Sequence, residues 1–177
     1  MVHARSPIVL AARTAVLVIG AGPIGIEASV QCVRAGLAVT LVERGSAVGA
    51  SVRQWGHCRF TTPYSINCST AGLHALTEAN YKRPVTSACP TGNHLCDHYL
   101  EPLYEWLALQ EDVQIHLDTQ AISITRGQWL KHDPADDARA SSPFAALLAS
   151  SDGADERRVE GFAAVLDCSG TCAPAAP

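Results

Sequence analysis

The stretch Ala15-Val-Leu-Val-Ile-Gly20-Ala-Gly-Pro-Ile-Gly25 decides the fold of this chain. Its first five residues form a continuous apolar run rich in β-branched side chains, which is typical of a strand buried on both faces. Apolar residues then recur at three- or four-residue spacing over residues 24–35, which predicts a helix, and Gly36 is placed to end it. A second apolar strand is expected over residues 37–42. Residues 14–43 therefore predict one parallel βαβ unit.

The glycines of this stretch follow the pattern GxGxxG between the strand and the helix. Gly20 permits a tight turn, Gly22 lets the backbone approach a pyrophosphate without an intervening Cβ, and Gly25 allows the helix to pack closely on the strand. The start of the helix also offers unpaired amides and the positive end of its dipole to phosphates. The pattern predicts a pyrophosphate site at the turn, made of Gly20, Gly22, Pro23, Ile24 and Gly25.

An acidic residue ends the second expected strand, because Glu43 lies 18 residues after Gly25. A carboxylate at this point can accept hydrogen bonds from both ribose hydroxyls of an adenosine, and it would repel a ribose 2′-phosphate. This argues against NADP at the first site. Arg44 would weaken that repulsion slightly, and it is placed at the edge of the predicted site, where a solvated surface charge is its simpler role.

The middle of the chain, residues 45–90, is rich in Gly, Ser, Thr, Asn and Pro, and we expect mostly loop with short helical turns at 48–54 and 71–79. So long an irregular stretch is typical of a functional segment. Asn93 is expected to cap a helix that runs to about residue 110, and Pro102 should kink or split that helix.

In the C-terminal half, the sequence predicts short strands and, at residues 131–142, a polar, flexible insertion between them. The last strand is apolar and could return to the parallel sheet. We therefore expect a single α/β domain over residues 1–177, with a Rossmann-type parallel sheet and an antiparallel β-meander in the C-terminal half. The expected strands cover residues 113–117, 121–126, 144–149, 158–162 and 164–167.

Composition narrows the classes of partner. A net charge of −4 gives no reason to expect a nucleic acid, and no apolar run approaches the roughly 20 residues of a membrane-spanning helix. Residues 1–18 are interpreted as a leader before the first strand, without a convincing signal-peptide cleavage site. The seven cysteines form no CxxC pair, which favours reduced thiols and a cytoplasmic location.

Other groups of residues give weaker evidence for a metal site or a catalytic site. His94, Asp97 and His98 lie within one or two helical turns of each other, but no second ligand cluster accompanies them, so we expect no metal site. We find no Ser-His-Asp, paired-carboxylate or nucleophile-elbow pattern and assign no catalytic residue. The lack of such a catalytic pattern is compatible with a protein whose cofactor performs the chemistry.

Residues 16–44, VLVIGAGPIGIEASVQCVRAGLAVTLVER, resemble the N-terminal FAD fingerprint of flavoproteins with two dinucleotide-binding domains, namely the flavin monooxygenase-like and pyridine nucleotide oxidoreductase-like families. Residues 49–57, GASVRQWGH, are similar to a glycine-and-tryptophan segment of such proteins, which implies a role for Trp55. Residues 165–171, VLDCSGT, resemble the strand and turn that close the first FAD segment, which implies contacts from Ser169 and Gly170.

The resemblance implies an FAD-binding oxidoreductase that uses NAD(P)H and acts on an unknown small molecule. Those families continue with a second GxGxxG for NAD(P)H and a Gly-Asp motif for the ribityl-phosphate arm, and neither occurs in these 177 residues. We therefore expect the first FAD segment without its partner domain. Two alternatives stay open, an NAD-binding dehydrogenase domain and a non-catalytic nucleotide-binding remnant.

Overall fold

A parallel sheet of four strands forms the centre of the computed structural model, which describes residues 14–127, 129–130, 132–134 and 136–170. Its order is β3-β2-β1-β7, and all three pairings are parallel. This corresponds to the strands 3-2-1-4 of the six-stranded Rossmann order, so the predicted fold is confirmed. The sequence predicted that the strand at residues 113–117 belongs to the meander. This is wrong, because β3 pairs with β2 in the parallel sheet. The strands are β1 (Ala15–Ile19), β2 (Ala38–Val42), β3 (Val113–His116) and β7 (Ala164–Asp167).

Helix α1 (Pro23–Arg34) connects β1 to β2 and ends where the sequence predicts. Gly36 has a φ of 75°, in the left-handed region that glycine adopts without strain. The amides of Gly36 and Leu37 donate to the carbonyls of Val33 and Cys32, at 2.9 and 3.0 Å. These two bonds form a Schellman motif, which satisfies the last carbonyls of the helix and turns the chain into β2.

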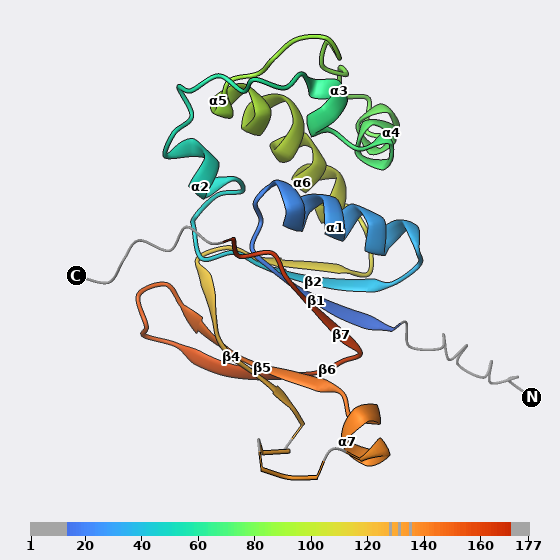
Figure 1. Ribbon diagram of the computed structural model, residues 1–177, viewed down its shortest axis with the longest axis vertical. Helices are drawn as coiled ribbons and strands as arrows, with labels where there is room; N and C mark the ends of the chain where they lie inside the picture. Colours follow the sequence, from blue (N-terminus) through green and yellow to red (C-terminus); the bar gives the residue numbers. More distant parts are fainter. Residues whose placement is uncertain (1–13, 128, 131, 135, 171–177) are drawn as a thin grey trace, which may run out of the picture.

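A layer of helices follows β2 and covers the same face of the sheet as α1 (Figure 1). It is made of α2 (Ala50–Arg53), α3 (Tyr64–Asn67), α4 (Thr70–Glu78), α5 (Gly92–Leu95), the π-helical turn η1 (Cys96–Leu100) and α6 (Glu101–Ala108).

The cap of the longest helical stretch differs from the sequence prediction. Thr91, not Asn93, is the N-cap of α5, and its side chain accepts from the amide of His94 at 3.2 Å. Pro102 lies in the first turn of α6, directly after the π-helical turn. The backbone stays in the right-handed helical region at Leu95, Cys96, Leu100 and Glu101, so the stretch is one helix interrupted by a π-helical turn and is not split in two. Pro102 has no amide to donate to the preceding turn, and a helix with a proline in its interior must be locally distorted.

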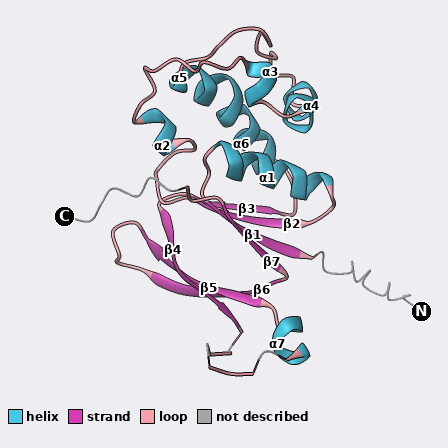
Figure 2. Cartoon of the chain, in the orientation of Figure 1, coloured by secondary structure: helices cyan, strands magenta, loops and turns pink. Residues whose placement is uncertain are grey.

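The antiparallel meander lies on the opposite face of the parallel sheet (Figure 2). It consists of β4 (Thr119–Arg126), β5 (Phe144–Ser150) and β6 (Glu156–Phe162), in the order β4-β5-β6. The polar insertion before β5 is not wholly irregular, because it contains α7 (Asp137–Ser141), whose N-cap Asp136 accepts from the amide of Arg139 at 2.8 Å.

Two apolar cores explain why β1 is apolar throughout. Val16 and Val18 face the core beneath the helices, whereas Leu17 faces a smaller core shared with the meander residues Leu148 and Phe162. No helix in the described ranges is long and apolar enough to cross a membrane. The proposed leader, apart from residues 14–18, and Thr171 at the end of the closing turn lie outside the described residues.

Candidate functional site

The three glycines of the turn after β1 have different surroundings. A Cβ on Gly20, whose φ is 97°, would lie 2.7 Å from the carbonyl oxygen of Cys168, and one on Gly25 would lie 1.7 Å from the carbonyl oxygen of Gly20. Both glycines are therefore required by packing. A Cβ on Gly22 would meet nothing within 4 Å. The backbone at Gly22 thus borders open space that a ligand can fill.

The start of α1 faces the same space. Gly22 is the N-cap, Pro23 begins the helix, and no side chain from the described residues caps this end. The amides of the first turn have no intrahelical carbonyl to bond, and the helix dipole places partial positive charge there. This end of the helix can hold an anion without a basic side chain.

Glu43 ties the end of β2 to the glycine turn. Its Oε2 accepts from the amide of Ala21 and its Oε1 from the amide of Gly45, both at 2.7 Å. Each carboxylate oxygen has a second lone pair, so the group can still accept hydroxyl protons from a ligand. The carboxylate is half-buried at the edge of the turn.

A cavity of about 550 Å³ lies at the carboxyl ends of β1, β2 and β7, between the start of α1, α2 and β4. Ligands of open α/β sheets bind at this edge, and the volume suits a small molecule or cofactor. Most of the predicted site residues line the cavity: Gly20, Gly22, Pro23, Ile24, Glu43, Arg44, Ser169 and Gly170.

Two predicted residues do not line it. Gly25 packs beneath the turn against Gly20. Trp55 stacks at a tilt on Phe60, with ring centroids 5.4 Å apart, and 40% of its surface is exposed. The structure therefore places Trp55 away from the cavity.

Sequence reasoning missed one wall of the cavity and one carboxylate. Residues 119–124 of β4 form the wall, and a β-bulge between Ala121 and Ser123 interrupts its pairing with β5. The alternation of apolar and polar residues there predicted a strand but not what it faces. Asp167 ends β7 and also lines the cavity. The rule that ligands bind at the carboxyl ends of parallel strands would have identified it.

The turn after β7 is fixed by Asp167. Its Oδ1 accepts from the hydroxyl of Ser169 at 2.6 Å and from the amide of the same residue at 3.1 Å. These two bonds hold the pKa of the Asp167 carboxyl below its usual range, so the group is ionised at neutral pH.

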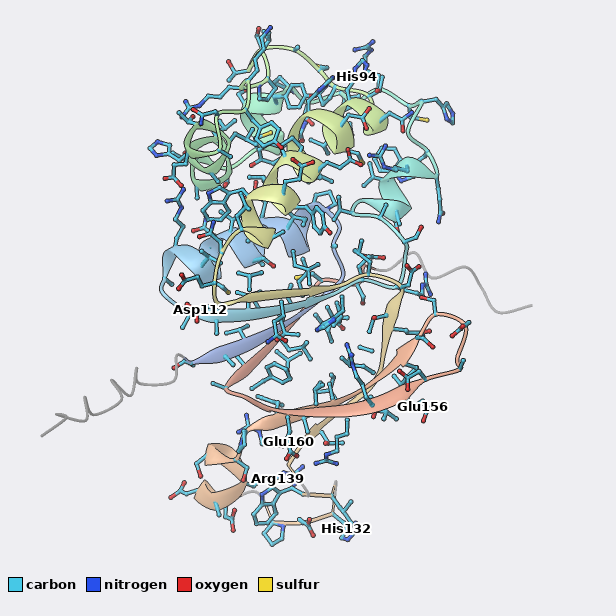
Figure 3. The ribbon with its side chains drawn as sticks, turned by 180° about the vertical axis from the view of Figure 1, so that it is seen from behind. His94, Asp112, His132, Arg139, Glu156 and Glu160 are labelled. Atoms are coloured by element: carbon cyan, nitrogen blue, oxygen red, sulfur yellow. The ribbon has the colours of Figure 1, made fainter. Side chains whose placement is uncertain are left out.

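The histidine pair lies elsewhere. His94 and His98 have ring centroids 5.6 Å apart, and Figure 3 shows His94 at the end of the helical layer farthest from the meander. Among the described residues, no group of three or more His, Cys, Asp and Glu side chains is placed to hold a metal ion. The six cysteines within the described ranges are free thiols.

The strand order and the glycine turn define a fold of Rossmann type. The chain belongs to the pyridine nucleotide-disulphide oxidoreductase family, whose sequence profile matches residues 17–130. No curated protein sequence matches the chain.

Solved structures share the fold at low identity. The bacillithiol disulfide reductase of Bacillus cereus is 14% identical with a TM-score of 0.59, over 88% of this chain and 39% of that chain. A steroid monooxygenase bound to NADP is 20% identical with a TM-score of 0.58, over 89% of this chain and 26% of that one. The enzyme OTEMO in complex with FAD and NADP is 18% identical with a TM-score of 0.57, over 94% and 26%. The chain therefore spans well under half the length of these proteins.

Proposed function

We propose that the cavity binds FAD through its ADP moiety, and that this chain is the FAD-binding segment of a flavin-dependent oxidoreductase. In a full-length form, NAD(P)H would supply hydride and an unknown small molecule would be the substrate. The open space over Gly22, between the uncapped start of α1 and the Glu43 carboxylate, carries the proposal. Membership in the oxidoreductase family and the FAD named with one structural relative support it.

Each part of the site has a distinct role in this proposal. The amides at Gly22 and Ile24 hold the pyrophosphate, Gly20 and Pro23 shape the turn that presents them, and Gly25 lets α1 pack closely beneath that turn. Glu43 accepts from the adenosine ribose, with Arg44 beside it at the rim of the cavity. Ser169 and Gly170 close the side of the cavity next to β7. Bound flavin would supply the redox chemistry, and the protein would bind and orient it.

NAD is the second candidate ligand, because Glu43 can accept from the adenosine ribose of either dinucleotide. The two differ in a direct measurement, since bound flavin absorbs visible light and NAD does not. A chain that binds FAD but supports no NAD(P)H oxidation would instead be a non-catalytic nucleotide-binding module. A cytoplasmic location and the absence of a nucleic-acid partner stay predictions from composition.

A titration of the purified chain with FAD tests the proposal. We expect saturable binding, and Glu43→Ala should weaken it by about 1–3 kcal/mol because charge-assisted hydrogen bonds to the ribose are lost. The matched control is Glu105→Ala, which removes an exposed carboxylate from α6 and should leave affinity unchanged. Equal affinities of the wild type and Glu43→Ala would refute the assignment of the ribose site.

A further inference from the structure

The ends of three neighbouring strands are level at the cavity. Ile19 at the end of β1 pairs in register with Val42 of β2 on one side and with Asp167 of β7 on the other. Glu43 follows Val42 directly, so a carboxylate stands on each side of the glycine turn. Neighbouring strands are about 4.8 Å apart, which places the two carboxylate-bearing strands about 10 Å apart with the turn between them.

A dinucleotide has a matching arrangement, with one hydroxyl-bearing unit on each side of a central pyrophosphate. Its pyrophosphate joins two hydroxyl-bearing five-carbon units, the adenosine ribose on one side and a ribityl chain or a second ribose on the other. If the pyrophosphate lies over Gly22 and the adenosine ribose lies at Glu43, the second unit extends toward the end of β7.

Asp167 has a free acceptor at that end. Both hydrogen bonds from Ser169 go to its Oδ1. Its Oδ2 accepts from no residue in the described part of the chain, and the side chain lines the cavity. An ionised carboxylate only accepts hydrogen bonds, so its free oxygen suits a hydroxyl group and repels a phosphate.

We propose that Asp167 is a specificity-determining residue of this cavity, which accepts hydrogen bonds from the hydroxyls of the unit that follows the pyrophosphate. This inference rests on the proposed dinucleotide function. The shared chemistry is a neutral polyol, which is the ribityl chain in FAD and the nicotinamide ribose in NAD. Asp167 would favour such ligands over nucleotides that end in a phosphate.

Four ligands separate these possibilities in calorimetric titrations of the 177-residue chain. ADP ends at the phosphate, ADP-ribose adds only the second sugar, and FAD and NAD⁺ carry the two alternative units. We expect Asp167→Ala to weaken binding of ADP-ribose about tenfold, because hydrogen bonds to a charged acceptor are lost. Asp167→Asn retains an acceptor for Ser169 and should weaken the binding of ADP-ribose by about threefold. Neither variant should weaken the binding of ADP. Loss of the negative charge at residue 167 should instead strengthen it, because the terminal phosphate of ADP is no longer repelled.

The control is Asp152→Asn, which changes a carboxylate of the same kind outside the cavity. Asp152 accepts from the Ser150 hydroxyl at 2.5 Å and from the amide of Ala154 at 3.0 Å, in the turn between β5 and β6. It should leave all four affinities unchanged. Retained ADP binding by the Asp167 variants shows that the cavity is still formed.

The outcomes are distinct. A loss confined to FAD or to NAD⁺ among the two intact dinucleotides identifies which unit Asp167 contacts. Equal weakening of ADP and ADP-ribose would overturn the inference, because Asp167 would then only shape the turn. Unchanged affinity for all ligands would also overturn it while leaving the proposed function intact. A wild-type chain that binds none of the four ligands would refute the proposed function itself.

Discussion

Gly22 differs from its neighbouring glycines in a way that a single substitution can reveal. Its φ of −75° is accessible to any residue, and a Cβ would extend into open space. We therefore expect Gly22→Val to fold normally and to lose FAD binding, because the new side chain occupies the place of the pyrophosphate. Circular dichroism and a flavin titration of the same sample measure the two effects.

Gly25→Ala is the informative comparison, because its Cβ would lie 1.7 Å from the carbonyl oxygen of Gly20. It should lower the free energy of unfolding, since α1 must shift away from the sheet. A Gly22→Val variant that still binds flavin tightly would mean that the ligand lies elsewhere in the molecule.

Among the elements, α1, α4 and the π-helical turn are joined by a half-buried polar network. The Tyr99 hydroxyl donates to Oε1 of Glu27, and the amide and hydroxyl of Ser69 donate to the two oxygens of Glu27 at 3.0 and 2.6 Å. Ser69 also caps α4. Burial, and then the Glu27 carboxylate, raise the pKa of Tyr99, so that its hydroxyl stays protonated as a donor.

Tyr99→Phe should therefore destabilise the helical layer by about 1–3 kcal/mol, because the half-buried Glu27 carboxylate loses a donor. Urea unfolding measures this change. Tyr104→Phe is the control, since that hydroxyl on α6 has no hydrogen bond to any residue that the structure describes. The network would be irrelevant to stability if both variants unfolded at the same urea concentration.

The elements differ in how well the sequence predicts them, for physical reasons. The bounds of β1 follow from its apolar run, because both of its faces are buried. The cap at Thr91 was missed because Thr and Asn are both good N-caps, and only tertiary packing chooses between them. Trp55 was assigned to the site by resemblance, yet its ring packs on Phe60, which local sequence does not indicate.

The residues that line the cavity also differ in how well the sequence predicts them. Residues of the βαβ unit were predictable because the glycine pattern fixes local backbone geometry. The wall from β4 depends on how the meander folds back under the sheet, a contact between segments far apart in the chain. Asp167 reaches the cavity through the pairing of β7 with β1, about 150 residues apart in sequence.

At the scale of the whole molecule, the join between the parallel sheet and the meander should respond to pH. Burial, and then the Arg157 guanidinium, lower the pKa of His116 from its usual value of 6.5. The unfolded chain therefore binds a proton at a higher pH than the folded chain does. Stability is independent of this group well above pH 6.5 and falls as pH drops through 6.5 toward the folded pKa.

His116→Gln should reduce the loss of stability between about pH 7.5 and 5.5, because the titrating group is removed. Thermal unfolding across that range checks it. His94→Gln, at an exposed site on the helical layer, should keep the wild-type slope. A His116→Gln profile parallel to that of the wild type would show that the meander contact does not sense protonation.

The 177-residue chain on its own should bind FAD without turning over NAD(P)H. Hydride transfer requires the nicotinamide to be held against the flavin ring with reacting atoms roughly 3–3.5 Å apart. Holding it there takes a second dinucleotide site, and the sequence contains one GxGxxG. The structural relatives have more than half of their length outside the matched region, and such a site has room there. The cavity is proposed to hold the ADP half of FAD, so we expect a modest affinity. Absorbance at the nicotinamide band, recorded with FAD and NADH or NADPH, should decline no faster than with free flavin. Steady oxidation well above that rate would show that this single domain assembles a complete active site.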